Sequence, residues 1–411
     1  MKMSGAKMVI ESLHQEGVEV VFGYPGGAIM NVYDEIYKQN YFEHILNRHE
    51  QACVIAAEGY ARSTGKTGVA IVTSGPGFTN AITGIADAYM DSIPVVIISG
   101  QVPTTIIGTD GFQEIDAVGI SRPCTKHNYL VNKIEDLPRI IKEAFHLAST
   151  GRPGPVHVDI PKDITAQIGD FIYPSEVSMP TYKPTINYNK RQLKKAMEAI
   201  SNAKKPLLYI GGGAILSNCG YEIRDLAKKL NIPAVETLMA RGVMGDENPL
   251  FFGMLGMHGE YAANMAAHET DLLISLGARF DDRVTGRLDE FASKAKVIHI
   301  DIDPTSIAKL VVADYPIVGD LKLTVEAMIE DAENYEINDF SNWVELLKDY
   351  REKEPLRYID TDDLIKPQWP IQRVGKILGD NAIISTDVGQ HQMWTAQFFP
   401  FSHPRQWITS G

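Results

Sequence analysis

Apolar residues along roughly the first 160 positions gather into short, almost wholly apolar runs, and a segment with helical spacing follows each run. Runs of this kind are typical of parallel strands that helices cover on both faces. The pattern therefore predicts an α/β domain built on a parallel sheet. The expected strands are 18–22, 44–48, 69–74, 94–100 and 156–160, and the expected helices begin near Ser4, Ala28, Glu50, Thr79 and Glu135.

The same alternation returns after residue 190, beyond a stretch with three prolines and little periodicity at 171–189 that we interpret as a linker. Its expected strands are 207–210, 233–237, 271–277 and 296–302. A charged stretch of low apolar content from about 335 to 368 is interpreted as a second linker, before a helix after Trp369 and a strand at 382–387. We therefore expect three α/β domains with parallel sheets flanked by helices, at 1–170, 190–335 and 365–411.

The last of these domains is expected to be incomplete, because roughly 45 residues cannot bury a self-sufficient α/β core. The formal charge of −13 over 411 residues argues against a nucleic-acid partner. Three scattered cysteines and the lack of a long apolar run favour a reduced, cytoplasmic protein without a membrane span. An organelle protein whose leader has been removed stays open as the alternative.

Glycine-rich turns follow three of the expected strands of the first domain: GYPGG at 23–27, SGPG at 74–77 and SGQVP at 99–103. Ligands of open parallel sheets bind at the carboxyl ends of the strands, and glycine lets a backbone N–H approach them closely. Each turn alone is also explained as an ordinary strand-to-helix connection. Three at one sheet edge favour a binding site.

Glu50 is the strongest single candidate for a catalytic residue. It follows the second strand and opens a helix whose next residues are almost all apolar. A carboxyl group among apolar neighbours at a sheet edge suits proton exchange. The alternative is a first-turn glutamate that complements the helix dipole.

The second domain has three features at expected strand ends that favour a bound nucleotide: YIGGGA at 209–214, GARFDDRVTG at 277–286, and Asp301 with Asp303. Glycine turns at a helix start hold phosphates, and an acidic residue at a strand end commonly binds a ribose hydroxyl. A salt-bridged surface loop is the alternative for 277–286. Carboxylates without a fixed loop pattern are weak evidence for a metal.

Several motifs follow one another along the chain: GYPGG, RHEQAC, TSGPGFTNAITGIADAYMDSIP, SGQVPTTIIGTDGFQE, SGRPGPVHVDIPKD, MLGMHG, GARFDDRVTG, HIDID and STDVGQHQMW. Together and in this order, they resemble the catalytic subunit of acetohydroxyacid synthase (acetolactate synthase). The resemblance covers essentially the whole chain. It implies a thiamine-diphosphate-dependent transferase with three α/β domains. Such an enzyme decarboxylates pyruvate and joins the two-carbon unit to pyruvate or 2-oxobutanoate, in branched-chain amino-acid biosynthesis.

The resemblance also assigns roles in the first domain. Glu50 resembles the carboxyl that hydrogen-bonds the aminopyrimidine of thiamine diphosphate, so that the cofactor's own nitrogen can deprotonate the thiazolium carbon. Gly26 and Gly27 resemble the turn beside the reacting centre, and Gln113 a second active-site contact. The implied residues on the substrate side are Phe112, Lys126, Lys162, Asp282 and Arg283.

In this family the second domain holds FAD, which undergoes no net redox change in the reaction. The residues that match its contacts are Arg152, Gly211, Gly212, Gly213, Thr237, Leu238, Leu255, Gly256, Met257, His258, Gly277, Ala278, Arg279, Phe280, Asp281, Asp301, Ile302 and Asp320. In the third domain, Gln390 and His391 match contacts to the thiamine diphosphate. The Mg²⁺ ligands of the family are expected beyond Gly411, and the 411-residue chain is expected to be inactive alone.

The resemblance further implies a homodimer or homotetramer and a separate regulatory small subunit. One alternative is another thiamine-dependent enzyme, such as a 2-oxo acid decarboxylase, an oxidase or glyoxylate carboligase, although the last lacks the glutamate that Glu50 matches. The other alternative is a non-catalytic FAD-binding fragment. The choice of second substrate, feedback inhibition and the oligomeric state do not follow from the sequence.

Overall fold

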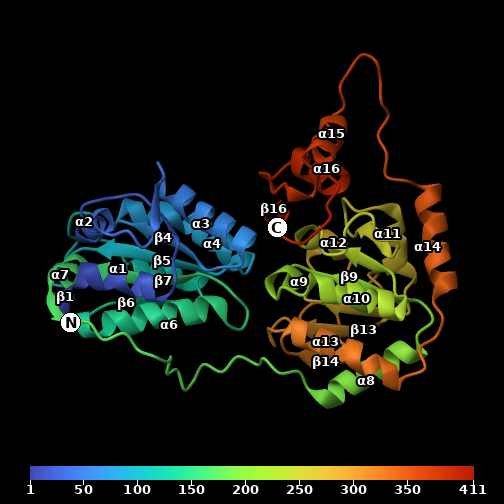
Figure 1. Cartoon of the computed structure of the whole chain (residues 1–411), viewed down its shortest axis with the longest axis horizontal. Helices are drawn as coiled ribbons and strands as arrows, with labels where there is room; N and C mark the ends of the chain where they lie inside the picture. Colours follow the sequence, from blue (N-terminus) through green and yellow to red (C-terminus); the bar gives the residue numbers. More distant parts are fainter. The chain divides into compact units, whose positions relative to one another are not determined.

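The computed structural model describes all 411 residues, which divide into two compact units, Met1–Lys183 and Pro184–Gly411. Each unit contains a six-stranded parallel sheet with helices packed on it (Figure 1). The α/β fold class predicted from the sequence is therefore confirmed. No helix of the chain is both long and apolar enough to cross a bilayer.

The sheet of the first unit has the strand order β3-β2-β4-β5-β7-β6. Its strands are β2 (Val20–Gly23), β3 (Glu43–Leu46), β4 (Gly68–Val72), β5 (Val95–Gln101), β6 (His127–Leu130) and β7 (Val156–Pro161). The helices are α1 (Gly5–Gln15), α2 (Met30–Lys38), α3 (Glu50–Thr64), α4 (Pro76–Met90), α5 (Ala117–Ser121), α6 (Leu137–Ser149) and α7 (Lys162–Ala166). The short strands β1 (Lys2–Ser4) and β8 (Ile168–Asp170) form a separate antiparallel pair.

The central strands β4 and β5 are buried along their whole length, which explains their nearly continuous apolar sequence. Alternate residues such as Val69 and Ile71 pack into one core together with residues of α1, α2 and α6. Helices α3 and α4 pack against each other. Because every neighbouring pair of strands is parallel, the turns after β2, β3, β4, β5 and β7 all lie at one edge of this sheet.

The sheet of the second unit has the order β11-β10-β9-β12-β13-β14 and is also parallel throughout. Its strands are β9 (Pro206–Ile210), β10 (Ala234–Glu236), β11 (Phe251–Met254), β12 (Leu272–Leu276), β13 (Lys296–Asp301) and β14 (Tyr315–Val318). The helices of this region are α8 (Lys190–Asn202), α9 (Gly213–Leu216), α10 (Gly220–Leu230), α11 (Tyr261–Glu269), α12 (Asp282–Thr285) and α13 (Leu321–Asp331).

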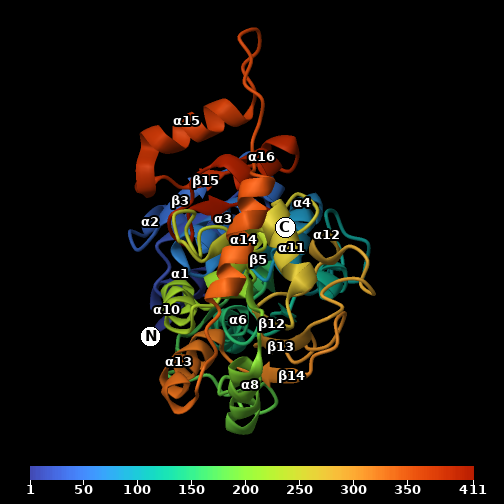
Figure 2. The ribbon, with the colours of Figure 1, turned by 90° about the vertical axis from the view of Figure 1, so that its right-hand side faces the viewer.

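The stretch from about 335 to 368, predicted to be a linker, contains the helix α14 (Ser341–Lys353). The prediction was wrong for these residues. Trp343, Val344 and Leu347 lie on one face of α14 and are buried in the core of the second unit. The helix packs against α11, beside which it is drawn in both views of the ribbon (Figures 1 and 2). Its many charged residues lie on the opposite face. The low apolar content averaged over this stretch therefore led us to miss an amphipathic helix.

The C-terminal residues form α15 (Gln368–Leu378), α16 (Gln390–Phe398) and a parallel pair of two-residue strands, β15 (Ile384–Ser385) and β16 (Trp407–Ile408). This segment does not bury a core of its own. Ala396, Phe399, Phe401 and Trp407 form a small cluster with Met254, at the end of β11. The segment therefore belongs to the same compact unit as the central sheet.

Candidate active site

Glu50 is the first residue of α3 and is only 7% exposed. The side chain of His49 caps the helix by accepting a hydrogen bond from the backbone N–H of Gln51. The side-chain amide of Asn80, in the first turns of α4, donates to Oε2 of Glu50 at 3.0 Å. A Cβ atom at Gly77 would lie 3.2 Å from Oε1 of Glu50. The carboxylate is thus held between the starts of two helices at the carboxyl edge of the sheet.

Thr73 lies between two of the glycine-rich turns. Its hydroxyl accepts a 3.3 Å hydrogen bond from the backbone N–H of Ala28, in the turn after β2. A Cβ atom at Gly26 or at Gly77 would lie 2.4 or 2.6 Å from the methyl group of Thr73. These contacts explain why both positions need glycine. Gly27, in contrast, has no atom within 4 Å of the place that a Cβ would take, so it borders open space.

Gln113 is brought to the same region by its backbone, which has a positive φ of 59°. A Cβ atom at Gly75, whose φ is 58°, would lie 2.7 Å from the carbonyl oxygen of Gln113. The neighbouring Phe112 is 88% exposed. The structure therefore gathers the segments of Glu50, Gly27 and Gln113 around the turn at 74–77. The roles predicted for these residues stay predictions.

A fully buried polar network lies behind this edge, between β5 and β7, and the sequence reasoning missed it. The Ser99 hydroxyl donates to Oδ1 of Asp159 at 2.5 Å and is 2.7 Å from Nε2 of His157. His157 Nδ1 is 3.0 Å from the Ser121 hydroxyl, and the His157 ring stacks on Phe78 of α4. Polar residues at alternate positions of two buried strands were the available signal.

Burial sets the charge state of this network. It lowers the pKa of His157 to about 3, which keeps the ring neutral. It raises the pKa of Asp159 to about 7, against the opposing effect of the hydrogen bonds from Ser99 and Gln101. A neutral His157 that accepts from Ser121 at Nδ1 donates from Nε2 to Ser99, and Ser99 in turn donates to Asp159.

Gln101 links the network to the segment that carries Gln113. Its side-chain amide donates to Oδ2 of Asp159 and to the carbonyl of Ile115, both at 2.9 Å. Farther along, Asp163 accepts hydrogen bonds from the backbone and the hydroxyl of Thr104. The segment from 103 to 116 is therefore tied to Asp163 of α7 near its start and to Gln101 of β5 near its end.

The two lysines predicted for the substrate side lie at opposite edges of this sheet. Lys162 is exposed and follows β7, so it is at the same edge as Glu50. Lys126 precedes β6, at the other edge. Its ammonium group donates to the carbonyls of Leu147 and Thr150, at the end of α6. Arg152 also lies at that other edge, before β7, where it donates to the hydroxyl of Ser92.

In the second unit, the residues predicted to contact FAD follow all six strands of the sheet. Since these strands are parallel, the residues meet at one edge. They are Gly211, Gly212 and Gly213 after β9, Thr237 and Leu238 after β10, Leu255, Gly256, Met257 and His258 after β11, Gly277, Ala278, Arg279, Phe280 and Asp281 after β12, Asp301 and Ile302 at the end of β13, and Asp320 after β14.

Glycine allows two of these turns to touch. The N–H of Gly213 donates to the carbonyl of Gly277, and a Cβ atom at Gly277 would lie 2.8 Å from the backbone of Gly213. Gly277 also has a φ of 65°. The nearby hydroxyl of Thr237 is buried and has no hydrogen-bond partner within the protein. An unsatisfied buried hydroxyl at this edge fits a polar ligand.

The GARFDDRVTG segment is partly core and partly surface. Phe280 is 1% exposed and packs on the rings of Tyr209, Phe291 and His299. Burial lowers the pKa of His299 to about 4. Asp281, Asp282 and Arg283 are exposed, and Asp281 caps the short helix α12. The backbone carbonyl of Arg283 accepts from the N–H of Met257, which joins the turns after β11 and β12.

The two remaining carboxylates at this edge are engaged with nearby backbone. Asp301 accepts from the N–H of Asp303, and Asp320 caps α13 through the N–H of Leu323. In the C-terminal segment, Gln390 and His391 are exposed at the start of α16. Their position at a helix N-terminus suits an anion. The chain contains no group of three or more His, Cys, Asp or Glu residues arranged to hold a metal ion.

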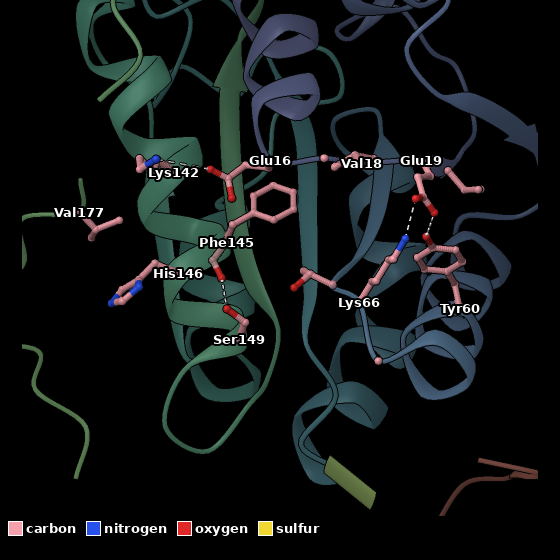
Figure 3. Close-up of a pocket in the computed structure, with 14 residues that line it drawn as sticks. Glu16, Val18, Glu19, Tyr60, Lys66, Lys142, Phe145, His146, Ser149 and Val177 are labelled. Carbon is pink, nitrogen blue, oxygen red and sulfur yellow. Dashed lines mark hydrogen bonds and ion pairs between the residues drawn. The ribbon is translucent and has the colours of Figure 1, made fainter. Parts of the chain in front are cut away.

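A pocket of about 550 Å³ in the first unit lies at the sheet edge opposite Glu50 (Figure 3). It is bordered by the ends of α1, α3 and α6 and contains none of the predicted site residues. Its charged side chains pair with one another: Lys66 with Glu19 at 2.6 Å and Lys142 with Glu16 at 4.0 Å. We assign it no role in the reaction.

Comparison with known proteins agrees with this geometry. Residues 3–120 match the thiamine pyrophosphate enzyme N-terminal TPP binding domain, and residues 193–328 match the thiamine pyrophosphate enzyme central domain. The chain is 50% identical to the acetolactate synthase large subunit of Haemophilus influenzae and 48% identical to the acetolactate synthase isozyme 3 large subunit of Escherichia coli. Both alignments cover all of this chain and 72% of the relative.

The acetolactate synthase of Mycobacterium leprae is 49% identical over the whole chain, which covers 66% of that protein. The two matched domains define the chain as a thiamine pyrophosphate enzyme. The six-stranded parallel sheet, with Glu50 at the edge that carries the glycine-rich turns, agrees with this class. Within that class, this chain belongs to the acetolactate synthase large-subunit family. The resemblance inferred from the sequence motifs is confirmed.

Proposed function

We propose that the protein is an acetohydroxyacid synthase: it decarboxylates one pyruvate and joins the remaining two-carbon unit to a second pyruvate or to 2-oxobutanoate. The products are CO₂ with 2-acetolactate or 2-aceto-2-hydroxybutanoate, which feed branched-chain amino-acid synthesis. The observation that carries this proposal is the buried Glu50 carboxylate, fixed by Asn80, in a chain about half identical to acetolactate synthases along its length.

Thiamine diphosphate supplies the carbon nucleophile that attacks the 2-oxo group. The chain's part is to hold the cofactor and to exchange its proton. One oxygen of Glu50 accepts from Asn80, and the carboxylate is nearly removed from water. Such a group can hold a ring nitrogen by a strong hydrogen bond and take or return a proton there. Gly77 leaves the space beside Oε1 that a side chain would close.

The open space at Gly27 and the exposed ring of Phe112 suit a small 2-oxo acid. Lys162 supplies positive charge at the same edge, where it can attract the acid's carboxylate. Gln113 is proposed as a further contact in this region. Asp282 and Arg283 complete the proposed substrate residues. Lys126 is not kept among them, because it lies at the opposite edge of the sheet and donates to the end of α6.

The second unit is proposed to hold FAD at the edge where its six strands end. The residues fit a dinucleotide, because glycine turns let the backbone approach phosphates and the Thr237 hydroxyl lacks a partner. A flavin here is proposed to act as a structural element, because joining two pyruvate molecules with loss of CO₂ involves no net oxidation or reduction. Arg152 of the first unit remains among the proposed FAD contacts.

The start of α16 is proposed to contact the diphosphate through Gln390 and His391. Its unpaired backbone N–H groups favour negative charge. We propose Mg²⁺ as the ion that accompanies the diphosphate and assign no residue of this chain as its ligand.

Because the relatives are bacterial and are named large subunits, we propose a cytoplasmic enzyme with a separate regulatory small subunit. We also propose a homodimer or homotetramer. Helices α3 and α4 expose small and apolar side chains, including Ile55 and Met90, on a surface suited to a second copy.

The function is tested by giving pyruvate, thiamine diphosphate, Mg²⁺ and FAD to the purified full-length gene product. Acetolactate with one CO₂ for every two pyruvate molecules is the expected result. Acetaldehyde as the main product would favour a decarboxylase, and acetate with peroxide would favour an oxidase. Replacing FAD by a flavin analogue that cannot be reduced should restore activity, whereas a protein that binds no flavin would contradict the proposed role of the second unit.

A further inference from the structure

Arg241 forms a buried connection between the central sheet and the C-terminal segment. It follows the short turn after β10 and is 3% exposed. Its Nε donates to the carbonyl of Ala396 in α16 at 2.9 Å. Its two terminal nitrogens donate to Glu236 at 3.0 Å and to Asp246 at 2.7 Å. The side chain therefore uses donors on all three guanidinium nitrogens.

The two carboxylates beside Arg241 each accept a further hydrogen bond from the backbone. Glu236, the last residue of β10, also accepts from the backbone N–H groups of Gly242 and Met244. Asp246 accepts from the backbone N–H of Phe401, in the C-terminal segment. Removing one partner of such a buried cluster leaves the others unpaired, so the arrangement tolerates little displacement.

The guanidinium group also lies between two aromatic rings. Its central carbon is 5.2 Å from the ring centre of Phe251 on β11 and 5.1 Å from that of Phe401. One ring belongs to the sheet and the other to the C-terminal segment. Cation–π contacts of this kind hold a planar guanidinium in one orientation.

Two turns at the proposed FAD edge touch the same segment. The side chain of Gln397 donates to the carbonyl of His258, after β11, at 2.8 Å. Leu238, after β10, packs on the cluster formed by Met254, Ala396, Phe399, Phe401 and Trp407. The C-terminal half of α16 and the residues after it therefore contact the turns after β10 and β11, which the flavin is proposed to order.

We propose that Arg241 is a positioning residue that couples flavin binding to the placement of α16, and hence of Gln390 and His391 at its start. The inference rests on the proposed function. A nine-residue helix is rigid, so fixing its end at Ala396 also fixes its beginning. Flavin that orders the turns at 237–241 and 255–258 then orders α16 through the Arg241 hydrogen bonds.

The test is hydrogen–deuterium exchange of peptides covering 390–398 in the full-length gene product, with and without FAD. FAD should slow exchange by about tenfold in the original protein, within the usual range of coupling between sites. In Arg241→Lys, flavin fluorescence should still report binding, but the protection of 390–398 should be largely lost. Arg287→Lys, an exposed arginine paired only with Asp289 and Glu290, should behave like the original protein.

Retained protection in a flavin-bound Arg241→Lys variant would overturn the coupling and leave the proposed function intact. Failure of the original protein to bind flavin would instead contradict the proposed function. If Arg241→Lys does not fold, Asp246→Ala serves in its place, because it removes a carboxylate that pairs with Arg241 from a less buried position. Reduced flavin-dependent protection is then expected, and unchanged protection would again overturn the proposal.

Discussion

The side-chain amide of Asn80 donates a 3.0 Å hydrogen bond to the carboxylate of Glu50, joining the first turns of α4 and α3. A glutamate that served only to complement a helix dipole would need neither this partner nor burial. The contact therefore favours the reading of Glu50 as a positioned acid–base group.

Asn80→Ala should lower turnover by roughly tenfold, because a catalytic group that loses its anchor samples unproductive positions. The KM for pyruvate should change little, since Asn80 is not proposed to touch the substrate. Steady-state kinetics of the full-length gene product measure both quantities. Unaltered turnover would mean that the hydrogen bond does not position Glu50 for the reaction.

Gly277→Ala should weaken flavin binding and destabilise the second unit. The new methyl group would both strain a φ of 65° and meet the backbone of Gly213 at 2.8 Å. Gly286→Ala is the matched control, because its φ of 56° is similar but its Cβ position is open. Strain alone should cost about 1–3 kcal/mol in each variant. Equal flavin affinity in the two variants would contradict the role given to the contact.

Asp159→Asn should loosen the segment from 103 to 116. The introduced amide can replace only one of the two acceptor oxygens, so the donor of either Ser99 or Gln101 loses its partner. We expect faster proteolysis within 103–116 and a loss of about tenfold in kcat/KM, since Gln113 lies on this segment. Asp170→Asn, on the exposed strand β8, is the control. Normal proteolysis of the Asp159 variant would show that the network does not hold the segment.

Glu58→Gln should flatten the dependence of stability on pH. Burial, reinforced by the nearby charge of Asp87, raises the pKa of Glu58 to about 9 in the folded chain, against an ordinary value of 4.5. Between these values the folded chain keeps a proton that the unfolded chain has released, so the free energy of unfolding falls as pH rises. Glutamine has no such proton. Denaturant unfolding at pH 5, 7 and 9 should therefore show a smaller decline in the variant, and an equal decline would contradict the assigned pKa.

The sequence predicted the central strands well because their apolar runs are continuous. The six-stranded sheets nevertheless contain three strands that the pattern did not show: β6, β11 and β14. All three are edge strands, and they carry residues such as His127, Gly253 and Pro316 that interrupt an apolar run. Edge strands need apolar residues on fewer sides, so their sequences carry a weaker signal.

The site was predictable only in part. The glycine turns and Glu50 could be placed at one edge because parallel strands end together. Thr73, Asn80 and the buried Ser99–His157–Asp159 network could not, since their contacts join residues far apart in sequence. The helix α14 was missed, and a linker predicted at 335–368, because its charged residues outnumber apolar ones such as the buried Trp343 and Leu347.

The central claim is that the Glu50 carboxylate performs proton exchange in acetolactate formation, and the most direct measurement is the turnover of Glu50→Gln beside Glu58→Gln. The two variants make the same chemical change in one helix, but only Glu50 lies at the ligand edge. Acetolactate formation from pyruvate should fall by about 10²–10⁴ in Glu50→Gln, with folding preserved, and stay near normal in Glu58→Gln. Near-normal turnover of a folded Glu50→Gln enzyme would contradict the account.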